Sequence, residues 1–173
     1  MHWRDEIIAR IEALIDRAGR LASWLILAVV ALLFLQIPMR ELAHFGHNQV
    51  NDIGQLCHAT VFMVGVAYAM RWDAHVRVDI FYGRMSARRK ALVDLLGTLL
   101  FVLPWLVIVT RDAIPIVVNS WRDLEAFSET YTPGYFLLKT QLLVFAALVA
   151  LAALANILRA LGTLVAAAAP KRQ

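Results

Sequence analysis

The stretch "LASWLILAVVALLFLQIPM", residues 21–39, decides the fold of this chain. It holds no charged side chain, and about 20 apolar residues in a helix cross a hydrocarbon core of about 30 Å. In lipid every backbone amide needs an internal partner, and a run this long without alternation is typical of a helix rather than a barrel strand. The run starts late and no small-x-small cleavage site follows it, so we expect a retained membrane-spanning helix rather than a signal peptide.

Three more apolar runs of similar length follow, at about residues 53–70, 91–110 and 135–158. Hydrophobic residues make up 61% of the 173 residues, more than a soluble domain of this size normally holds. The sequence therefore predicts an all-α integral membrane protein with four transmembrane helices in a single domain, residues 1–173. The apolar pattern of the third run continues past Thr110 through "IPIVVNSW", which predicts a long helix that is tilted or is bent at Pro104 or Pro115.

The first 20 residues have a pattern of their own. Apolar side chains recur there at spacings of three and four, with charges of both signs opposite them. They include Trp3, Ile7, Ile11, Leu14 and Ala18. This pattern predicts an amphipathic helix over residues 1–20 that lies in the membrane interface before the first span.

The basic residues follow the ends of the apolar runs. Thirteen of the 17 Lys and Arg residues fall in the two tails and in the second connection, and four fall in the other connections or at the start of the last run. The excess of positive charge predicts that both termini are cytoplasmic and that the second connection meets anionic lipid headgroups. Nucleic acid is not an expected partner, because the basic residues do not cluster on a soluble module.

The second connection carries six of these cations between residues 71 and 90. Within it the string "HVRVD" alternates His75, Arg77 and Asp79 with two valines, which predicts an extended piece with one polar and one apolar face. The guanidinium of Arg77 can bind a carboxylate or backbone carbonyls, and Asp79 can accept from Arg71. We interpret His75, Arg77 and Asp79 as residues that fix the shape of this connection. The alternative is a plain charged loop.

Ionisable residues inside the runs are few. Asp94 lies about one turn inside the third run, four residues after Lys90, and we favour an ion pair or a helix contact over a proton or ion site. Lys139 lies near the start of the fourth run and can extend its amine to the interface. Ser86 is the expected N-cap of the third helix.

The sequence offers no convincing cofactor site. His44, His47, Cys57 and His58 are nearby in sequence, yet without a second well-formed pair their spacing is a weak indication of metal binding. No two histidines are expected at matching depth on facing helices, as a bis-histidine haem requires. We expect no catalytic residues, no metal and no cofactor in this chain, and the single Cys57 excludes a disulfide within it.

The string "GVAYAMRWDAHVRVDIFYGRMSARRKALVDLLGTLLFVLP", residues 65–104, resembles the small membrane subunit of the tripartite ATP-independent periplasmic (TRAP) transporters, the DctQ-like family. Within the family it is most similar to the group labelled for mannitol or chloroaromatic compounds. The resemblance extends more weakly over residues 33–161. The matching positions outside the string are Gln36, Arg40, Asp52, Ser120, Trp121, Glu125 and Lys139. The chain departs from the family pattern at residues 55–58, where an aromatic residue is missing, and at Pro133-Gly134, where a longer turn is reduced.

The resemblance implies a partner system. In such systems a soluble periplasmic protein captures an organic acid or similar solute, and a large membrane subunit carries the substrate and sodium sites and moves as an elevator. The small subunit would pack one-to-one on the static scaffold of the large one, in the bacterial inner membrane. Arg40 and Asp52 are then expected to form an ion pair that bridges the first two helices at the periplasmic face. The alternative function is a membrane-anchor subunit of a respiratory or other enzyme complex.

Overall fold

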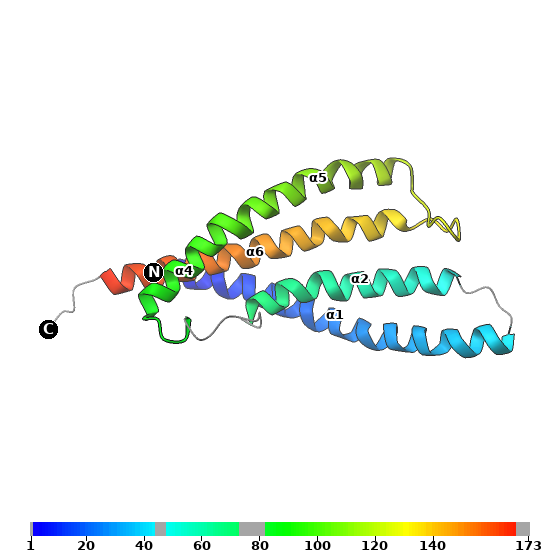
Figure 1. Cartoon of the computed structure of the whole chain (residues 1–173), viewed down its shortest axis with the longest axis horizontal. Coiled ribbons are helices and arrows are strands. Elements are labelled where there is room, and N and C mark those ends of the chain that lie inside the picture. Colours follow the sequence, from blue (N-terminus) through cyan, green and yellow to red (C-terminus); the bar gives the residue numbers. More distant parts are fainter. Residues whose placement is uncertain (1, 44–47, 73–81, 169–173) are drawn as a thin grey trace.

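The computed structural model describes residues 2–43, 48–72 and 82–168, and the chain is helical through most of them. Its elements are α1 (His2–Ala43), α2 (Asn48–Arg71), α4 (Ala87–Gly97), the π-helical segment η1 (Thr98–Val102), α5 (Leu103–Arg122) and α6 (Tyr135–Ala168) (Figure 1). The described residues contain no β-strand and only an isolated bridge between Ala126 and Pro133. The predicted all-α fold is confirmed.

Four helices are long and apolar enough to cross a membrane, as the sequence predicts. They cover His2–Pro38, Val50–Arg71, Ala87–Arg122 and Tyr135–Ala167. The third helix extends well past Thr110, and the fourth extends past residue 158. The helices thus extend beyond the apolar runs from which the sequence predicts them.

The third spanning helix changes its winding next to Pro104. The backbone N–H of Leu103 bonds to the carbonyl oxygen of Thr98, five residues back, at the end of the π-helical turn Thr98–Val102. Proline has no N–H and its ring crowds the preceding turn, so a wider turn before it relieves the clash. The helix curves along its length in Figure 1. Pro104 is one of the two prolines, with Pro115, at which the sequence predicts a bend.

The N-terminal part of α1 differs from the expected separate interfacial helix. The helix continues from residue 2 to residue 43 without a break, and Ile11, Ile15 and Ala22 are buried in the core, with Ile15 1% exposed. A Cβ atom added at Gly19 would collide with the Tyr68 ring of α2. Part of this apolar face is thus packed against neighbouring helices, whereas Trp3, Ile7 and Leu14 of the same face stay exposed.

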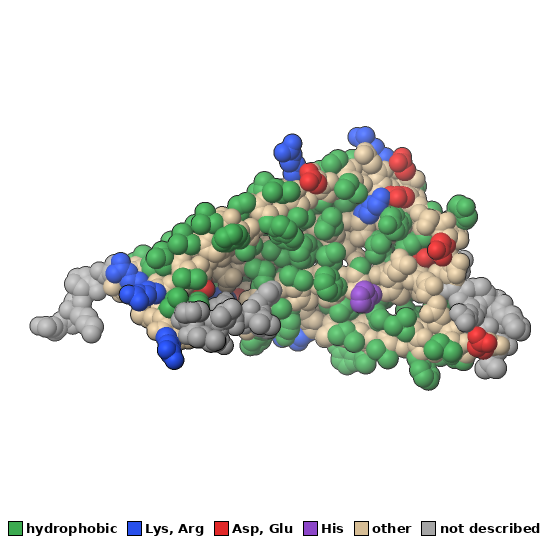
Figure 2. All heavy atoms as spheres, viewed as in Figure 1, with side chains coloured by type: hydrophobic (Ala, Val, Ile, Leu, Met, Phe, Trp, Pro, Cys, Tyr) green, Lys and Arg blue, Asp and Glu red, His purple; other side chains and the backbone are tan. Residues whose placement is uncertain are grey.

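The helices are arranged around α6. Helix α1 packs along α2, α2 packs on α6, and α4 and α5 pack on α6 as well (Figure 1). The core lies where α1, α2 and α6 meet, and small side chains of α6 let its neighbours approach closely. These small residues include Ala146, Ala152 and Ala155. Hydrophobic side chains cover most of the face drawn in Figure 2, and charged ones lie toward the two ends and along the upper edge.

Candidate functional sites at the two ends of the bundle

An ion cluster joins three helices at one end of the bundle. We call this end, where Arg71, Lys90 and Arg159 lie, the basic end. Nη2 of Arg71 in α2 lies 3.2 Å from Oε2 of Glu12 and 3.3 Å from Oδ2 of Asp16, both in α1. Arg159 of α6 pairs with the other oxygen of Glu12. Charges removed from water are costly unless they are paired, so this cluster holds α1, α2 and α6 in one register.

A groove of about 740 Å³ opens beside this cluster between α2, α4 and α6. The hydroxyl of Tyr82 donates to Oδ2 of Asp94 over 2.7 Å on its wall, and Nζ of Lys90 lies 5.2 Å from the centre of the Tyr82 ring. Asp94 therefore ties the residues before α4 to that helix. The cations Arg71 and Arg159 on the groove wall already bind carboxylates of α1.

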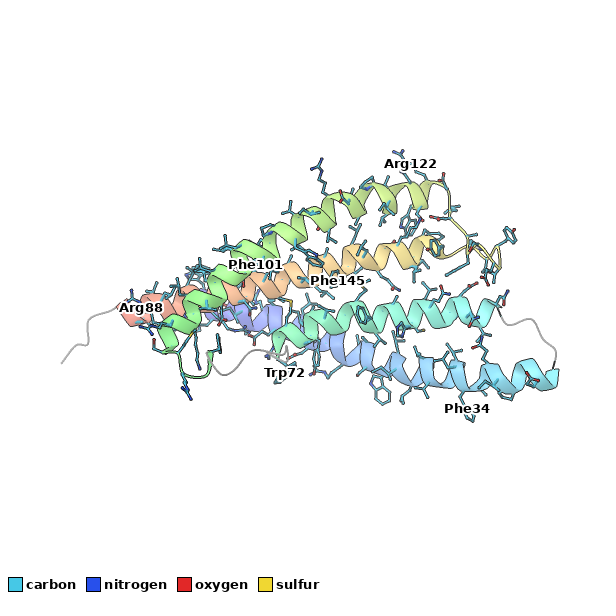
Figure 3. The ribbon with its side chains drawn as sticks, viewed as in Figure 1. Phe34, Trp72, Arg88, Phe101, Arg122 and Phe145 are labelled. Carbon is cyan, nitrogen blue, oxygen red and sulfur yellow. The ribbon has the colours of Figure 1, made fainter. Side chains whose placement is uncertain are left out.

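Helix α4 begins after Ser86, the expected N-cap. Ser86 has the extended backbone of an N-cap, with φ −64° and ψ 156°, but its side chain makes no capping hydrogen bond. The exposed Arg88 and Arg89 follow in the first turn, and Figure 3 shows Arg88 at the basic end. Cations in a first turn oppose the helix dipole, so these two residues are suited to anionic groups outside the chain.

A second cluster lies at the other end, which we call the loop end because residues 123–134 connect α5 and α6 there. Oε2 of Glu125 accepts hydrogen bonds from Nζ of Lys139 and from Oγ of Ser120, each over 2.5 Å. The hydrogen bond from Lys139 is the main reason that the pKa of Glu125 is lowered, and the bond from Ser120 adds to it. Lys139 is thus used within the chain, where it joins α6 to the connection.

The connection has a defined backbone. Leu124 and Tyr131 adopt positive φ values of 45° and 56°, which non-glycine residues rarely do, and Gly134 has φ 150°. The carbonyl oxygen of Glu125 accepts from the N–H of Tyr135 over 3.1 Å, and the Phe127 ring is buried against the Tyr135 ring. Such backbone conformations persist only where the surrounding contacts stabilise them. The connection is therefore an ordered structure over the ends of α5 and α6, and we call it the cap.

Asp52 fastens α2 to the same cap. Its side chain is 7% exposed, and Oδ2 accepts from the hydroxyl of Thr130 over 2.5 Å. Next to it, the amide nitrogen of Gln36 donates to Oδ1 of Asn51 over 2.7 Å and links α1 to α2. The Arg40 side chain lies outside the part that the structure describes, so its pairing with Asp52 stays a prediction. Sequence reasoning identified Asp52 but not its partner.

Polar contacts also connect helices within the spans. Nε2 of Gln141 in α6 donates to the hydroxyl of Thr60 over 2.8 Å and to the carbonyl of Leu56 over 3.1 Å, both in α2. Nε1 of Trp121 donates to the hydroxyl of Thr140 over 2.8 Å. Sequence reasoning missed these contacts, although a Gln and a Thr inside apolar runs are the residue types that hydrogen-bond across membrane helices.

The remaining candidates contribute less to the described site. His75, Arg77 and Asp79 lie outside the described residues, as do His44 and His47. Among the described residues, no three His, Cys, Asp or Glu side chains converge as metal ligands would. The described candidates Arg71, Asp94, Asp52 and Lys139 all make helix-to-helix or helix-to-connection contacts.

Residues 29–163 match the family model of the DctQ component of tripartite ATP-independent periplasmic transporters. The chain belongs to this family. Neither the curated proteins nor the solved structures compared with it gave a match. As a DctQ component it is a multi-pass membrane protein of a transporter that also comprises a large permease and a solute-binding protein. The matched range contains the residues of both end clusters except Glu12 and Asp16. These two residues of α1 precede residue 29.

Proposed function

We propose that this chain is the small accessory subunit that packs one-to-one on the scaffold of the large permease and supports sodium-coupled uptake of an organic acid or similar solute. The family match over residues 29–163 carries the proposal. The arrangement of charges supports it, because the described candidates bind neighbouring helices of the same chain. A helix bundle held together by such internal contacts suits a subunit that stays fixed while another subunit moves.

The proposal includes an orientation in the bacterial inner membrane. Helix α1 begins and α6 ends at the basic end, where Arg84, Arg88 and Arg89 are exposed (Figures 1 and 3). Positive charge collects on the cytoplasmic side, so both termini would be cytoplasmic and these side chains would meet anionic lipid. The cap over residues 123–134 would then face the periplasm and the solute-binding protein.

The sodium and substrate sites are proposed to lie on the large permease, with no cofactor on this chain. The anchor of an enzyme complex, the alternative from the sequence, gains no support from the family match. A subunit without a site of its own must contribute through the assembly, so loss of assembly should be its main loss of function.

The test is reconstitution. The chain is co-expressed with the large permease and purified through a tag on the chain, and uptake is measured in proteoliposomes with the binding protein and an inward sodium gradient. We expect an equimolar complex, with uptake only when both membrane chains are present. A large permease that is stable and transports fully without this chain would refute the accessory role, and uptake by this chain alone would assign it a pathway of its own.

A further inference from the structure

The groove between α2, α4 and α6 changes from polar to apolar along its length. Its wall on α4 and η1 runs from Ala87 to Val102, which is about 22 Å at a rise of about 1.5 Å per residue. The part nearest the start of α4 carries the charged Lys90 and Asp94, and the part farther along carries Gly97 and Val102. A ligand that fills the groove therefore needs one polar and one apolar end.

The inner part of the groove is suited to hydrocarbon. A Cβ atom added at Gly97 would meet no atom within 4 Å, so the missing side chain leaves space there. The hydroxyl of Thr98 donates to the backbone carbonyl of Asp94 over 2.7 Å and is thus bonded within its own helix. A polar ligand group placed between Gly97 and Val102 would lose the hydrogen bonds that it makes in water, whereas an acyl chain has none to lose.

The outer part of the groove offers hydrogen-bond donors. Nζ of Lys90 lies over the Tyr82 ring and, within the described residues, pairs with no carboxylate. Oδ1 of Asn156 accepts from Arg159 over 2.9 Å, while its amide nitrogen has no acceptor in the part of the chain that the structure describes. An ammonium and an amide nitrogen on one wall suit a ligand that carries several acceptor oxygens.

The charge around the outer part is positive. The two arginines on the groove wall are balanced by carboxylates of α1. The excess of positive charge comes from Lys90 and from Arg88 and Arg89, which are exposed in the first turn of α4, and Asp94 offsets only one of the three. The favoured ligand is therefore an anion at its polar end.

We infer that the groove binds one anionic phospholipid, with its phosphate at Lys90, its ester oxygens near Asn156 and one acyl chain along Gly97 and Val102. Lysine binds phosphate as a point charge, and the groove volume of about 740 Å³ falls within the range of about 300–1,000 Å³ that is usual for small-molecule sites. The three helices that form the groove are all candidate membrane spans, so the bilayer supplies the ligand. A lipid held by α2, α4 and α6 would stabilise their arrangement at the basic end, which goes beyond the proposed accessory function.

Native mass spectrometry tests the site. The full chain is purified in mild detergent and titrated with phosphatidylglycerol, phosphatidylcholine or inorganic phosphate. We expect one phosphatidylglycerol to bind about tenfold or more tightly than phosphatidylcholine, and inorganic phosphate not to displace it, because phosphate fills only the outer part of the groove. Equal binding of the two lipids, or displacement of the lipid by phosphate, would overturn the inference.

Two substitutions locate the bound lipid. Lys90→Gln removes the phosphate contact and Gly97→Leu fills the acyl path, and we expect each to weaken phosphatidylglycerol binding by about tenfold. The matched controls are Arg111→Gln, in an exposed cation outside the groove, and Gly65→Leu, at a glycine that also has no atom within 4 Å of an added Cβ. Controls that weaken binding as much as the site variants would show that the lipid is not held in the groove.

A photoreactive lipid gives a second measurement that needs no variant. Phosphatidylglycerol with a diazirine in its acyl chain is added to the unaltered chain, alone and as the complex with the large permease, and the labelled peptides are identified after irradiation. We expect labelling concentrated on residues 97–102 in both samples. Labelling spread evenly over the exposed helices would mean ordinary bilayer contact. Labelling that disappears in the complex would assign the groove to a segment of the permease. Either result overturns the inference, and the accessory function stands in both.

Discussion

Glu125 shows how a single side chain organises the loop end. Its carboxylate accepts hydrogen bonds from Lys139 of α6 and from the buried Ser120 of α5, while its backbone carbonyl accepts from Tyr135. One residue thus holds the end of one spanning helix, the start of the next and the connection between them. The pKa of Glu125 is lowered mainly by the hydrogen bond from Lys139, so the ionised form is the one that stabilises the cap.

The first prediction concerns the pH dependence of this contact. A carboxyl group whose pKa is lower in the folded state contributes stability that is fully present above its unfolded pKa and is lost as the pH falls through the folded pKa. We expect Glu125→Gln to lower the melting temperature of the detergent-solubilised complex at neutral pH and to flatten its decline below about pH 4. Glu129→Gln, in an exposed residue of the same connection, is the control. Identical pH profiles for the wild type and Glu125→Gln would contradict the contact.

The second prediction concerns the connection between α2 and α4, where His75, Arg77 and Asp79 remain candidates from the sequence. Arg77→Lys keeps the positive charge that directs topology but loses the planar guanidinium that binds two acceptors at once. We expect it to lower the yield of complex or the uptake rate while membrane insertion stays normal, and Asp79→Asn should act in the same direction. If both variants assemble and transport like the wild type, the connection is only a charged loop.

At the scale of elements, α1 is the helix for which the structure differs most from the sequence prediction. Its first 20 residues look like a helix resting on the membrane, yet they continue into the span and bury Ile11 and Ile15 against α2 and α6. Glu12 and Asp16, on the same stretch, bind Arg71 and Arg159. The stretch thus combines apolar packing with an ion cluster, which together hold the basic ends of three helices.

The third prediction tests this packing with two glycines. A methyl group at Gly19 would collide with the Tyr68 ring, whereas one at Gly65 would meet no atom within 4 Å. We expect Gly19→Ala to destabilise the protein by about 1–3 kcal/mol, and Gly65→Ala to be neutral or stabilising by up to about 1 kcal/mol, since alanine favours the helix. Thermal unfolding in one detergent measures both. Equal melting temperatures would mean that the start of α1 does not pack on α2.

At the scale of the whole molecule, the chain has two chemically different ends and apolar flanks between them. The basic end gathers exposed arginines and the ion cluster, and the loop end gathers the cap held by Glu125 and Asp52. Within the described residues, helix α5 packs on α6 and makes no comparable contact with α1 or α2. This asymmetry suits a subunit that is oriented by lipid charge and is attached sideways to a larger membrane protein.

The fourth prediction concerns orientation. Reporter fusions at Gly46 and Phe127 should behave as periplasmic, and fusions at Gly83 and Lys171 as cytoplasmic, because the excess of Lys and Arg stays on the cytoplasmic side. Paired alkaline phosphatase and green fluorescent protein fusions at each position give opposite signals. A periplasmic Gly83 would invert the molecule and with it the assignment of the cap.

The sequence by itself determined the fold class, the four spans and the family, because hydrophobic length, proline positions and a family's residue pattern are read along the chain. It also singled out Arg71, Asp94, Asp52 and Lys139 as candidates for structural or partner contacts. Only the tertiary structure showed what those partners are, namely Glu12, Asp16, Tyr82, Thr130 and Glu125. The two residues of each pair lie on different helices or connections, and their meeting depends on which helix faces pack together. The continuity of α1 was likewise decided by packing, since a lipid interface and a neighbouring helix select the same apolar periodicity.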